Sequence, residues 1–207
     1  RSDAADDDAA EIITAGGTIS LEARDGIADS SGADGFEIDT SGGNVTLVAD
    51  GTGAVFVDYV AADADALTLA LTATAATGAM NYESVATGAL TLDAVSTAGN
   101  NLTISHAGNI AANSVTTTTG TLTLATSAGT MVLTDVDSTE GAMNIDATGA
   151  ITVTDVDSTT GEINIETSGA SDIAIAAAAI GSTSGNVIVT ANDAAGTITL
   201  AAGTDKI

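Results

Sequence analysis

Residues 131–149 read MVLTDVDSTEGAMNIDATG, and residues 151–169 read ITVTDVDSTTGEINIETSG. The hexapeptide TDVDST begins at Thr134 in the first stretch and at Thr154 in the second, 20 residues later. Self-similarity at a fixed short period is typical of solenoids, in which identical supersecondary units stack on one another. This repeat therefore decides the fold class, and it can be followed in both directions along the chain.

One half of the repeat reads apolar, polar, apolar, two residues, Val or Ile, and then a Ser/Thr-rich run that ends in Gly. Clear copies begin at Leu90, Ile110, Met131 and Ile151, and a stretched copy begins at Ile173 and reaches Ile180. Looser copies are assigned at Val55 and Met80. We expect the Val or Ile positions to form one apolar column in the folded protein, made of Val95, Val115, Val136, Val156 and Ile180.

The other half of the repeat is shorter and reads apolar, polar, apolar, a few small polar residues and Gly. Copies begin at Val45, Leu67, Leu102, Leu122, Met143, Ile163 and Val187. We expect two inward columns here, Leu122–Met143–Ile163–Val187 and Leu124–Ile145–Ile165–Val189. The glycines that end the units, at 99, 120, 141, 161 and 185, are expected at one corner that needs either a left-handed backbone or close approach between neighbouring turns.

Each unit contains very short segments with a period of two, which is the period of a β-strand. Because a three-residue strand buries too little to stand alone, it must stack on the next unit. The sequence therefore predicts an all-β parallel β-helix, a β-solenoid with coils of about 20 residues. A β-barrel or β-sandwich is the competing fold, but three-residue strands on this period fit it poorly.

Composition and charge limit the function classes. The chain has 207 residues, 28 of them acidic and 3 Lys or Arg, so its formal net charge is −25. A surface that binds nucleic acid or an anionic membrane needs basic residues, so we predict neither partner. The absence of Cys excludes disulfides, and the absence of Pro suits unbroken strand pairing. We expect an acidic tail at residues 1–11 and one solenoid domain at residues 12–207, without membrane insertion.

The units GTLTLATSAG, GAMNIDATGAITVTDVDSTTG and GEINIETSGASDIAI resemble the repeats of very large bacterial surface proteins. These are the filamentous-haemagglutinin-like and beta strand repeat adhesins, and the resemblance covers about residues 40–203. It implies a right-handed parallel β-helix that is exported and serves as an adhesin shaft or fibre. The resemblance thus predicts an extracellular or cell-surface location in a prokaryote.

Four carboxylates are the candidate metal ligands. Asp135 and Asp155 should lie one coil apart, as should Asp137 and Asp157. Stacked like charges repel unless a cation bridges them, and carboxylate, hydroxyl and carbonyl oxygens are the ligands that calcium prefers. We therefore take these four residues as candidate calcium ligands, although neither the EF-hand nor the calcium β-roll motif is present. The competing interpretation is a solvated acidic face without bound ions.

No catalytic constellation is predicted. His106 is the only histidine, and no nucleophile or carboxylate pairs with it in sequence, so we expect a surface histidine in a turn. The stacked aspartates have a spacing that could suit a retaining glycosidase, but the stretch lacks the aromatic platforms of a sugar cleft. We accordingly predict that the protein is not an enzyme.

The expected function is mechanical: a structural rod that forms an adhesin shaft or the subunit of a cell-surface filament. Uncapped solenoid ends expose unpaired strands, so we expect self-association through these ends or continuation in a longer chain. The alternative is a carbohydrate- or surface-binding module that uses residues 58–65 and 170–185 as contact loops.

Overall fold

A computed structural model gives the fold of the chain. It describes residues 12–13, 17–24, 26–27, 36–40, 43–49, 54–60, 64, 66–73, 79–99, 101–176 and 180–201. Within these ranges the protein is all-β, and no helix there is long and apolar enough to cross a membrane. The expected tail at 1–11, the aspartates at 63 and 65 and the alanines at 177–179 lie outside the described residues.

The first sheet has nine parallel strands, one from each successive coil. In spatial order they are β1 (Ile12–Ile13), β3 (Phe36–Asp39), β5 (Val55–Tyr59), β7 (Met80–Ser84), β9 (Leu102–His106), β12 (Leu122–Thr126), β15 (Met143–Ala147), β18 (Ile163–Thr167) and β21 (Val187–Ala191). Register partners in this sheet lie about one repeat apart, since Met80 pairs with Leu102 and Leu102 with Leu122.

The second sheet has thirteen parallel strands. It begins with four long strands, β2 (Gly17–Ala23), β4 (Gly43–Ala49), β6 (Leu67–Ala73) and β8 (Ala89–Thr97). Nine short strands follow: β10 (Asn109–Ala112), β11 (Val115–Thr117), β13 (Met131–Leu133), β14 (Val136–Ser138), β16 (Ile151–Val153), β17 (Val156–Ser158), β19 (Ile173–Ile175), β20 (Ile180–Ser182) and β22 (Ile198–Leu200).

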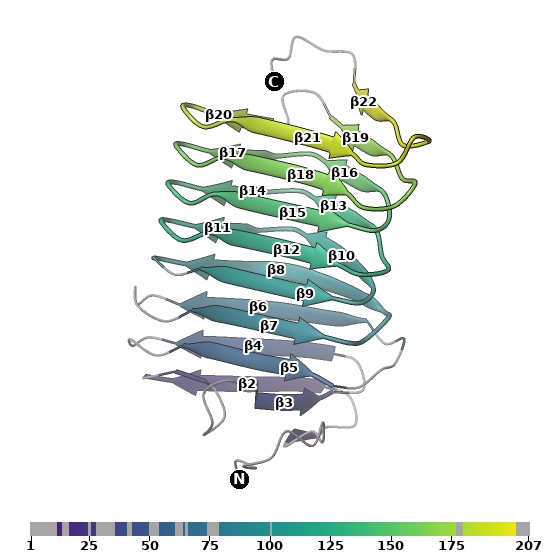
Figure 1. Cartoon of the computed structure of the whole chain (residues 1–207). Coiled ribbons are helices and arrows are strands. Elements are labelled where there is room, and N and C mark those ends of the chain that lie inside the picture. Colours follow the sequence, from purple (N-terminus) through teal and green to yellow (C-terminus); the bar gives the residue numbers. More distant parts are fainter. Residues whose placement is uncertain are drawn as a thin grey trace.

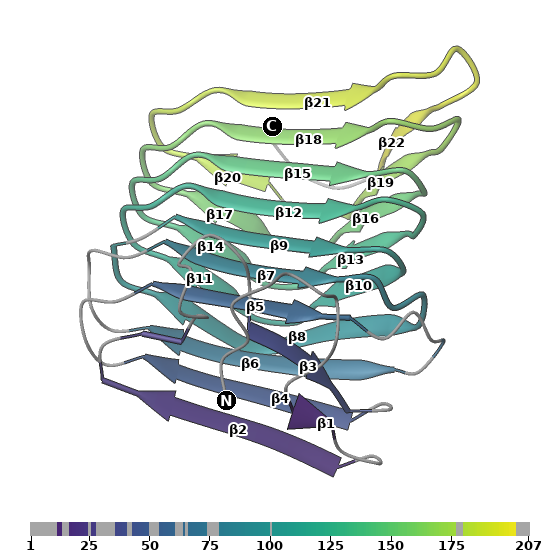
Figure 2. The same cartoon turned by 60° about the horizontal axis from the view of Figure 1, so that its bottom comes forward.

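The two sheets face each other along the whole molecule, and the chain alternates between them as it climbs (Figures 1 and 2). In Figure 1 the nearer strands run from left to right and the more distant strands run back, so each coil turns in a right-handed sense. The prediction of a right-handed parallel β-solenoid is therefore confirmed.

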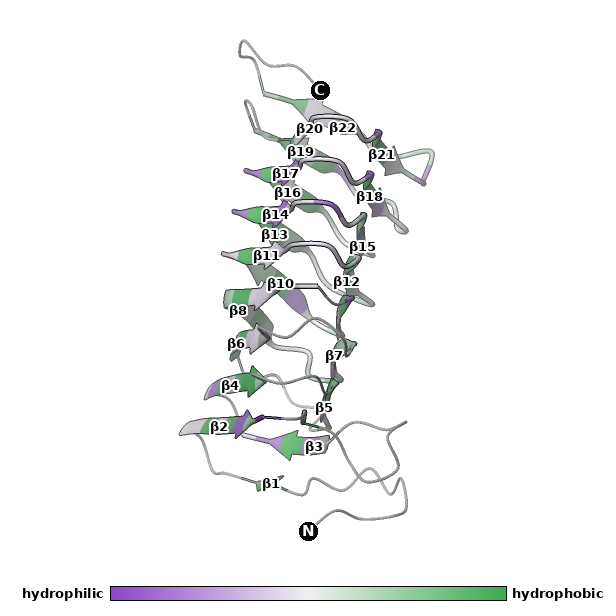
Figure 3. Ribbon diagram, turned by 90° about the vertical axis from the view of Figure 1, so that its left-hand side faces the viewer, coloured by the Kyte–Doolittle hydropathy of each residue, from purple (hydrophilic) through white to green (hydrophobic). Residues whose placement is uncertain are grey.

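The interior is filled by the apolar columns that the repeat predicts. Leu122, Met143 and Ile163 are consecutive register partners and are almost completely buried. The column from Val95 to Ile180 runs through the second sheet in the same way. Each fully buried side chain of this kind contributes roughly 1.5–3 kcal/mol, so the stacked columns carry most of the stability. Figure 3 shows the two layers edge-on.

The coil changes shape at β8. In β6 the inward residues Leu67, Leu69 and Leu71 alternate strictly, whereas in β8 the inward residues Leu92 and Val95 are three apart. The register of β6 with β8 shifts after Leu69, because β8 carries an additional residue there. From β10 onward a pair of short strands replaces the long strand and forms two sides of the coil. Two residues separate the strands in the pairs β10–β11, β13–β14 and β16–β17, and four separate β19 from β20.

One sequence assignment is wrong in the earlier coils. The segments at Val55 and Met80 belong to the first sheet, where β5 and β7 lead to β9. The segments at Val45 and Leu67 belong to the second sheet, where Leu67 pairs with Leu90. The two halves of the repeat were exchanged because coils before β8 lack the two-residue corner that distinguishes them.

The corner glycines are required by close approach between coils, as predicted. A Cβ built on Gly161 would overlap the carbonyl oxygen of Gly141, and one on Gly185 would overlap that of Gly161. None of these three is among the described glycines with positive φ, which are Gly17, Gly26 and Gly43. The backbone of the preceding coil therefore occupies the space that any side chain would need.

Candidate functional site

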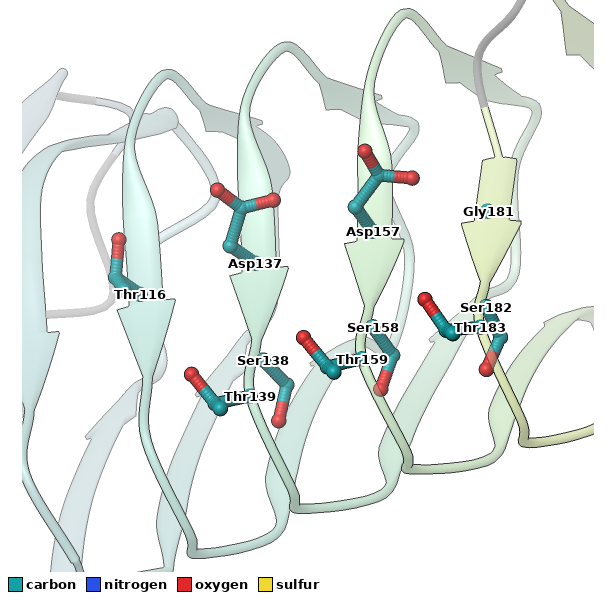
Figure 4. A pocket seen from close by; sticks show the side chains of 10 residues that line it. All are labelled: Thr116, Asp137, Ser138, Thr139, Asp157, Ser158, Thr159, Gly181, Ser182 and Thr183. Atoms are coloured by element: carbon teal, nitrogen blue, oxygen red, sulfur yellow. The ribbon is translucent and has the colours of Figure 1, made fainter.

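The strongest candidate site lies on the outer face of β14 and β17. Asp137 and Asp157 are register partners on these strands, and their sequence neighbours point into the core. A groove of about 510 Å³ runs across this face and continues to Thr116 on one side and Gly181 on the other. Figure 4 shows the two carboxylates next to each other, projecting to the same side.

A row of threonine hydroxyls forms the second wall of this groove. Thr139, Thr159 and Thr183 each follow the last residue of a short strand and line the groove with the two aspartates. In Figure 4 their hydroxyls project in one row, while Ser138 and Ser158 point away from them. The sequence signal for this row was the Ser-Thr pair at the end of β14, β17 and β20, in which the threonine follows the inward serine. The groove is thus lined by carboxylate and hydroxyl oxygens.

The aspartate carboxylates on this face repel one another. Partial burial, followed by the neighbouring carboxylates of Asp135, Asp155 and Asp157, raises the pKa of Asp137 above its ordinary value. Burial, followed by Asp157 and Asp135, likewise raises the pKa of Asp155. All four candidate residues therefore interact electrostatically, as their stacking in neighbouring coils predicts.

The four aspartates do not converge on one point. Asp137 and Asp157 lie on the strands, whereas Asp135 and Asp155 occupy the two-residue corners that precede them. Within the described part of the chain, no three acidic or histidine side chains are placed to hold a common metal ion. A cation at this site would have to complete its coordination with threonine hydroxyls and water.

Serine hydroxyls hold the turns below the groove; Ser138 and Ser158 are buried, and Ser182 is partly buried. Ser158 Oγ accepts a hydrogen bond from Gly161 N at 2.8 Å, and Ser182 Oγ accepts one from Gly185 N at 2.8 Å. Ser138 Oγ instead donates to the carbonyl oxygen of Gly141 at 2.8 Å. These serine hydroxyls thus fix the backbone from which the groove threonines project.

The expectation of a surface turn histidine is wrong. His106 is the last residue of β9, and its side chain is 2% exposed because it occupies an inward position of the strand. Its Nε2 lies 2.9 Å from the carbonyl oxygen of Gly88 in the preceding coil. The burial of His106 could not be predicted from the sequence because its partners in the neighbouring coils, Ser84 and Thr126, are polar, so no apolar alternation marks this inward position.

Replacing Asp137 with asparagine should stabilise the protein at neutral pH in buffer without calcium. The folded chain holds protons on Asp137 and Asp155 more tightly than the unfolded chain, so the repulsion is greatest above their raised pKa values and is relieved by acidification. After discounting for solvent screening, we expect a gain of about 0.5 kcal/mol. Thermal unfolding should show a Tm increase of about 1–2 °C at neutral pH.

The gain of Asp137→Asn should disappear as the pH approaches 4. A Tm increase that persisted unchanged in acid would contradict the electrostatic origin. Asp172→Asn is the opposing control, because hydrogen bonds from the Thr197 side chain and backbone lower the pKa of Asp172. Ionised Asp172 is thus favoured in the folded state, and its replacement should not raise Tm at neutral pH.

The two remaining acidic clusters, in the tail and at residues 63 and 65, lie outside the described residues.

The resemblance to surface adhesins stays a prediction. In comparisons with known proteins, no protein-family model, no curated protein and no solved structure matches the chain.

Proposed function

We propose that the chain is a structural rod of a prokaryotic cell surface, either a segment of an adhesin shaft or the subunit of an extracellular filament. The supporting observation is the continuity of the stack. Parallel pairing and buried columns pass through every described coil, from β3 to β21, without a register break in the first sheet. A uniform stack of this kind resists bending and extension because every coil is held by its neighbours.

The last coil supports end-to-end extension of the rod. Val187 and Val189 continue the inward columns but are only partly buried. Ile198 and Leu200 of β22 are 45% and 55% exposed. One edge of β21 pairs with β18, and its other edge has no strand partner among the described residues. Another coil stacked there would bury these side chains and pair this edge.

Native mass spectrometry with negative-stain imaging over a range of concentrations tests this proposal. Fibres that lengthen with concentration would identify a filament subunit, and single short rods would identify a shaft segment. Compact particles without an elongated axis would contradict the rod itself. A glycan array run on the same preparation distinguishes a purely structural rod from a binding module, because only the binding module should retain glycans.

A binding module is the second candidate, and the groove is the observation that favours it. Gly181, in β20, and Thr183, directly after it, line the groove and lie within residues 170–185, which the sequence suggested as a contact region. Hydroxyl and carboxylate oxygens can bind the hydroxyls of a glycan. Glycan binding that is lost in Asp157→Asn and Thr159→Ala would support this candidate over the rod.

Calcium bridging of Asp137 and Asp157 is the finer proposal for the same groove. Because a bound cation would cancel the repulsion between the two carboxylates, chelation with EDTA should lower Tm by several degrees. The double variant Asp137→Asn with Asp157→Asn is the matched control, since it should show no response to EDTA. An unchanged Tm of the unmodified protein in EDTA would exclude structural calcium at this site.

A further inference from the structure

His106 stands in a polar column inside the first sheet. The inward residues at this level are Tyr59, Ser84, His106 and Thr126, which are consecutive register partners on β5, β7, β9 and β12. All four are buried. A hydrophobic solenoid therefore contains a column of hydrogen-bonding groups at the corner where the chain leaves the first sheet.

The imidazole joins two coils. Its Nε2 lies 2.9 Å from the carbonyl oxygen of Gly88, which is part of the turn between β7 and β8. Because a carbonyl oxygen only accepts, Nε2 carries the proton and Nδ1 is the unprotonated nitrogen. His106 thus fastens the turn that leads into β8, the strand at which the coil changes from two sides to three.

The other side of the imidazole is unsatisfied. Nδ1 of His106 and Oγ of Ser84 are both buried and have no hydrogen-bond partner. The two residues are register partners, so these polar atoms come from adjacent positions of the same inward column. A buried acceptor without a donor costs roughly 1–3 kcal/mol, and a buried charge at the same place costs more.

The surrounding elements offer little to balance a positive charge on this ring. On β7, Glu83 is exposed and lines one pocket of about 240 Å³ together with His106, although no ion pair joins the two described side chains. Tyr82 of the same strand is buried with its hydroxyl unpartnered. On β8, Asp93 is exposed, while β10, β12 and the residues between β7 and β8 carry no titratable side chain. Burial lowers the pKa of His106, and the bond to the Gly88 carbonyl offsets this only in part.

We infer that His106 is an acid-sensitive staple between the coil of β7 and the coil of β9. Protonation of Nδ1 places an uncompensated charge in the core, which is relieved when the turn at 85–88 opens and admits water. The turn is the exposed segment beside the imidazole, since Val85 within it is 50% exposed and the Gly88 carbonyl at its end contacts Nε2. The contact to Gly88 persists in the charged form, because protonation of Nδ1 leaves the Nε2 proton in place, so it is the Nδ1 side that needs water.

The direction of the pH effect follows from linkage. In the unfolded chain the histidine takes up a proton near pH ~6.5, whereas in the folded chain it does so only at a lower pH. The stabilising effect of a neutral His106 is therefore complete above this range and is lost as the pH falls through it. The acidic groups at Asp137 and Asp155 act in the opposite direction and at lower pH.

The titration of His106 can be measured without ambiguity, because it is the only histidine in the chain. In an NMR titration its imidazole protons should show a midpoint clearly below that of a free histidine. Hydrogen exchange compared at about pH 7 and about pH 5.5 should show a selective loss of protection in residues 80–92 and 102–108. A midpoint at the ordinary value would overturn the inference.

Variants separate the titration from a merely structural role. His106→Thr installs the residue type found at the same level one coil later, at Thr126. Its Tm should be independent of pH between about 7 and 5.5, whereas the unmodified protein should lose several degrees. Should His106→Thr fail to fold, His106→Gln keeps a side-chain donor for the Gly88 carbonyl and should give the same flat profile.

A relocated histidine is the matched control. The double variant Ser105→His with His106→Thr keeps one histidine but moves it to the outward position of the same strand. It should titrate normally and leave Tm independent of pH in this range. Equal pH dependence in the unmodified protein and in the variants would show that other groups cause the effect, and would reject the staple.

Discussion

Replacing Gly161 with alanine is expected to destabilise the solenoid by about 3 kcal/mol or more, because the new Cβ would overlap the carbonyl oxygen of Gly141 in the coil below. Neither backbone can move without breaking the register of β17 and the coils on either side. The turn would also lose the geometry in which Gly161 N donates to Ser158 Oγ. Thermal and denaturant unfolding would measure the loss, with failure to fold as the extreme case.

The matched control is Gly181→Ala, the same substitution in a strand of the next coil. There the nearest atom to the new Cβ is Oδ1 of Asp157, which lies at the end of a side chain that can turn aside. We expect a change within about 0.5 kcal/mol. Equal losses at the two glycines would show that close backbone approach is not what the corner requires.

Replacing Leu124 with alanine is the second large effect, and we expect it to cost about 2–5 kcal/mol. Leu124 is fully buried and is stacked between Ile104 and Ile145 in one inward column. The cavity left by the substitution cannot close without moving the strands above and below. For a chain of this size each kcal/mol lowers Tm by roughly 2–4 °C, so calorimetry should detect the change readily.

Thr123→Ala tests the alternation on the same strand. Thr123 points outward and is only partly covered, so its replacement should change stability by less than about 0.5 kcal/mol. A large loss at Thr123 together with a small loss at Leu124 would place the wrong face of β12 in the core and would contradict the two-residue period.

The repeat predicted the solenoid because two features of it agree. Its period of about 20 residues is typical of a solenoid coil, and the two-residue alternation within each segment is typical of a short β-strand. A column such as Leu122–Met143–Ile163 can be identified in the sequence, since each coil places an apolar residue at the same offset. The stacking of Asp137 on Asp157 follows from the same offset, so that part of the candidate site was also accessible from the sequence.

The features that could not be predicted from the sequence lie where the repeat is polar or incomplete. His106 occupies an inward position but breaks the apolar alternation, so its burial became evident only from its register with Ser84 and Thr126. The coils before β8 lack the two-residue corner, and both of their sides therefore show the same alternation. The groove beside Asp137 depends on how the turn threonines project, which no pattern of residue types specifies.

Engineered disulfides between outward register partners test the stacked coil most directly, and the native chain has no cysteine to interfere. Asn144 and Asn164 are register partners on β15 and β18. The double variant Asn144→Cys with Asn164→Cys should therefore form an intramolecular disulfide under mild oxidation and retain its fold. The comparison is Asn144→Cys with Thr154→Cys, a pair that a β-hairpin in a barrel or sandwich would bring together. The solenoid predicts efficient cross-linking of the first pair and none of the second, and the reverse result would contradict it.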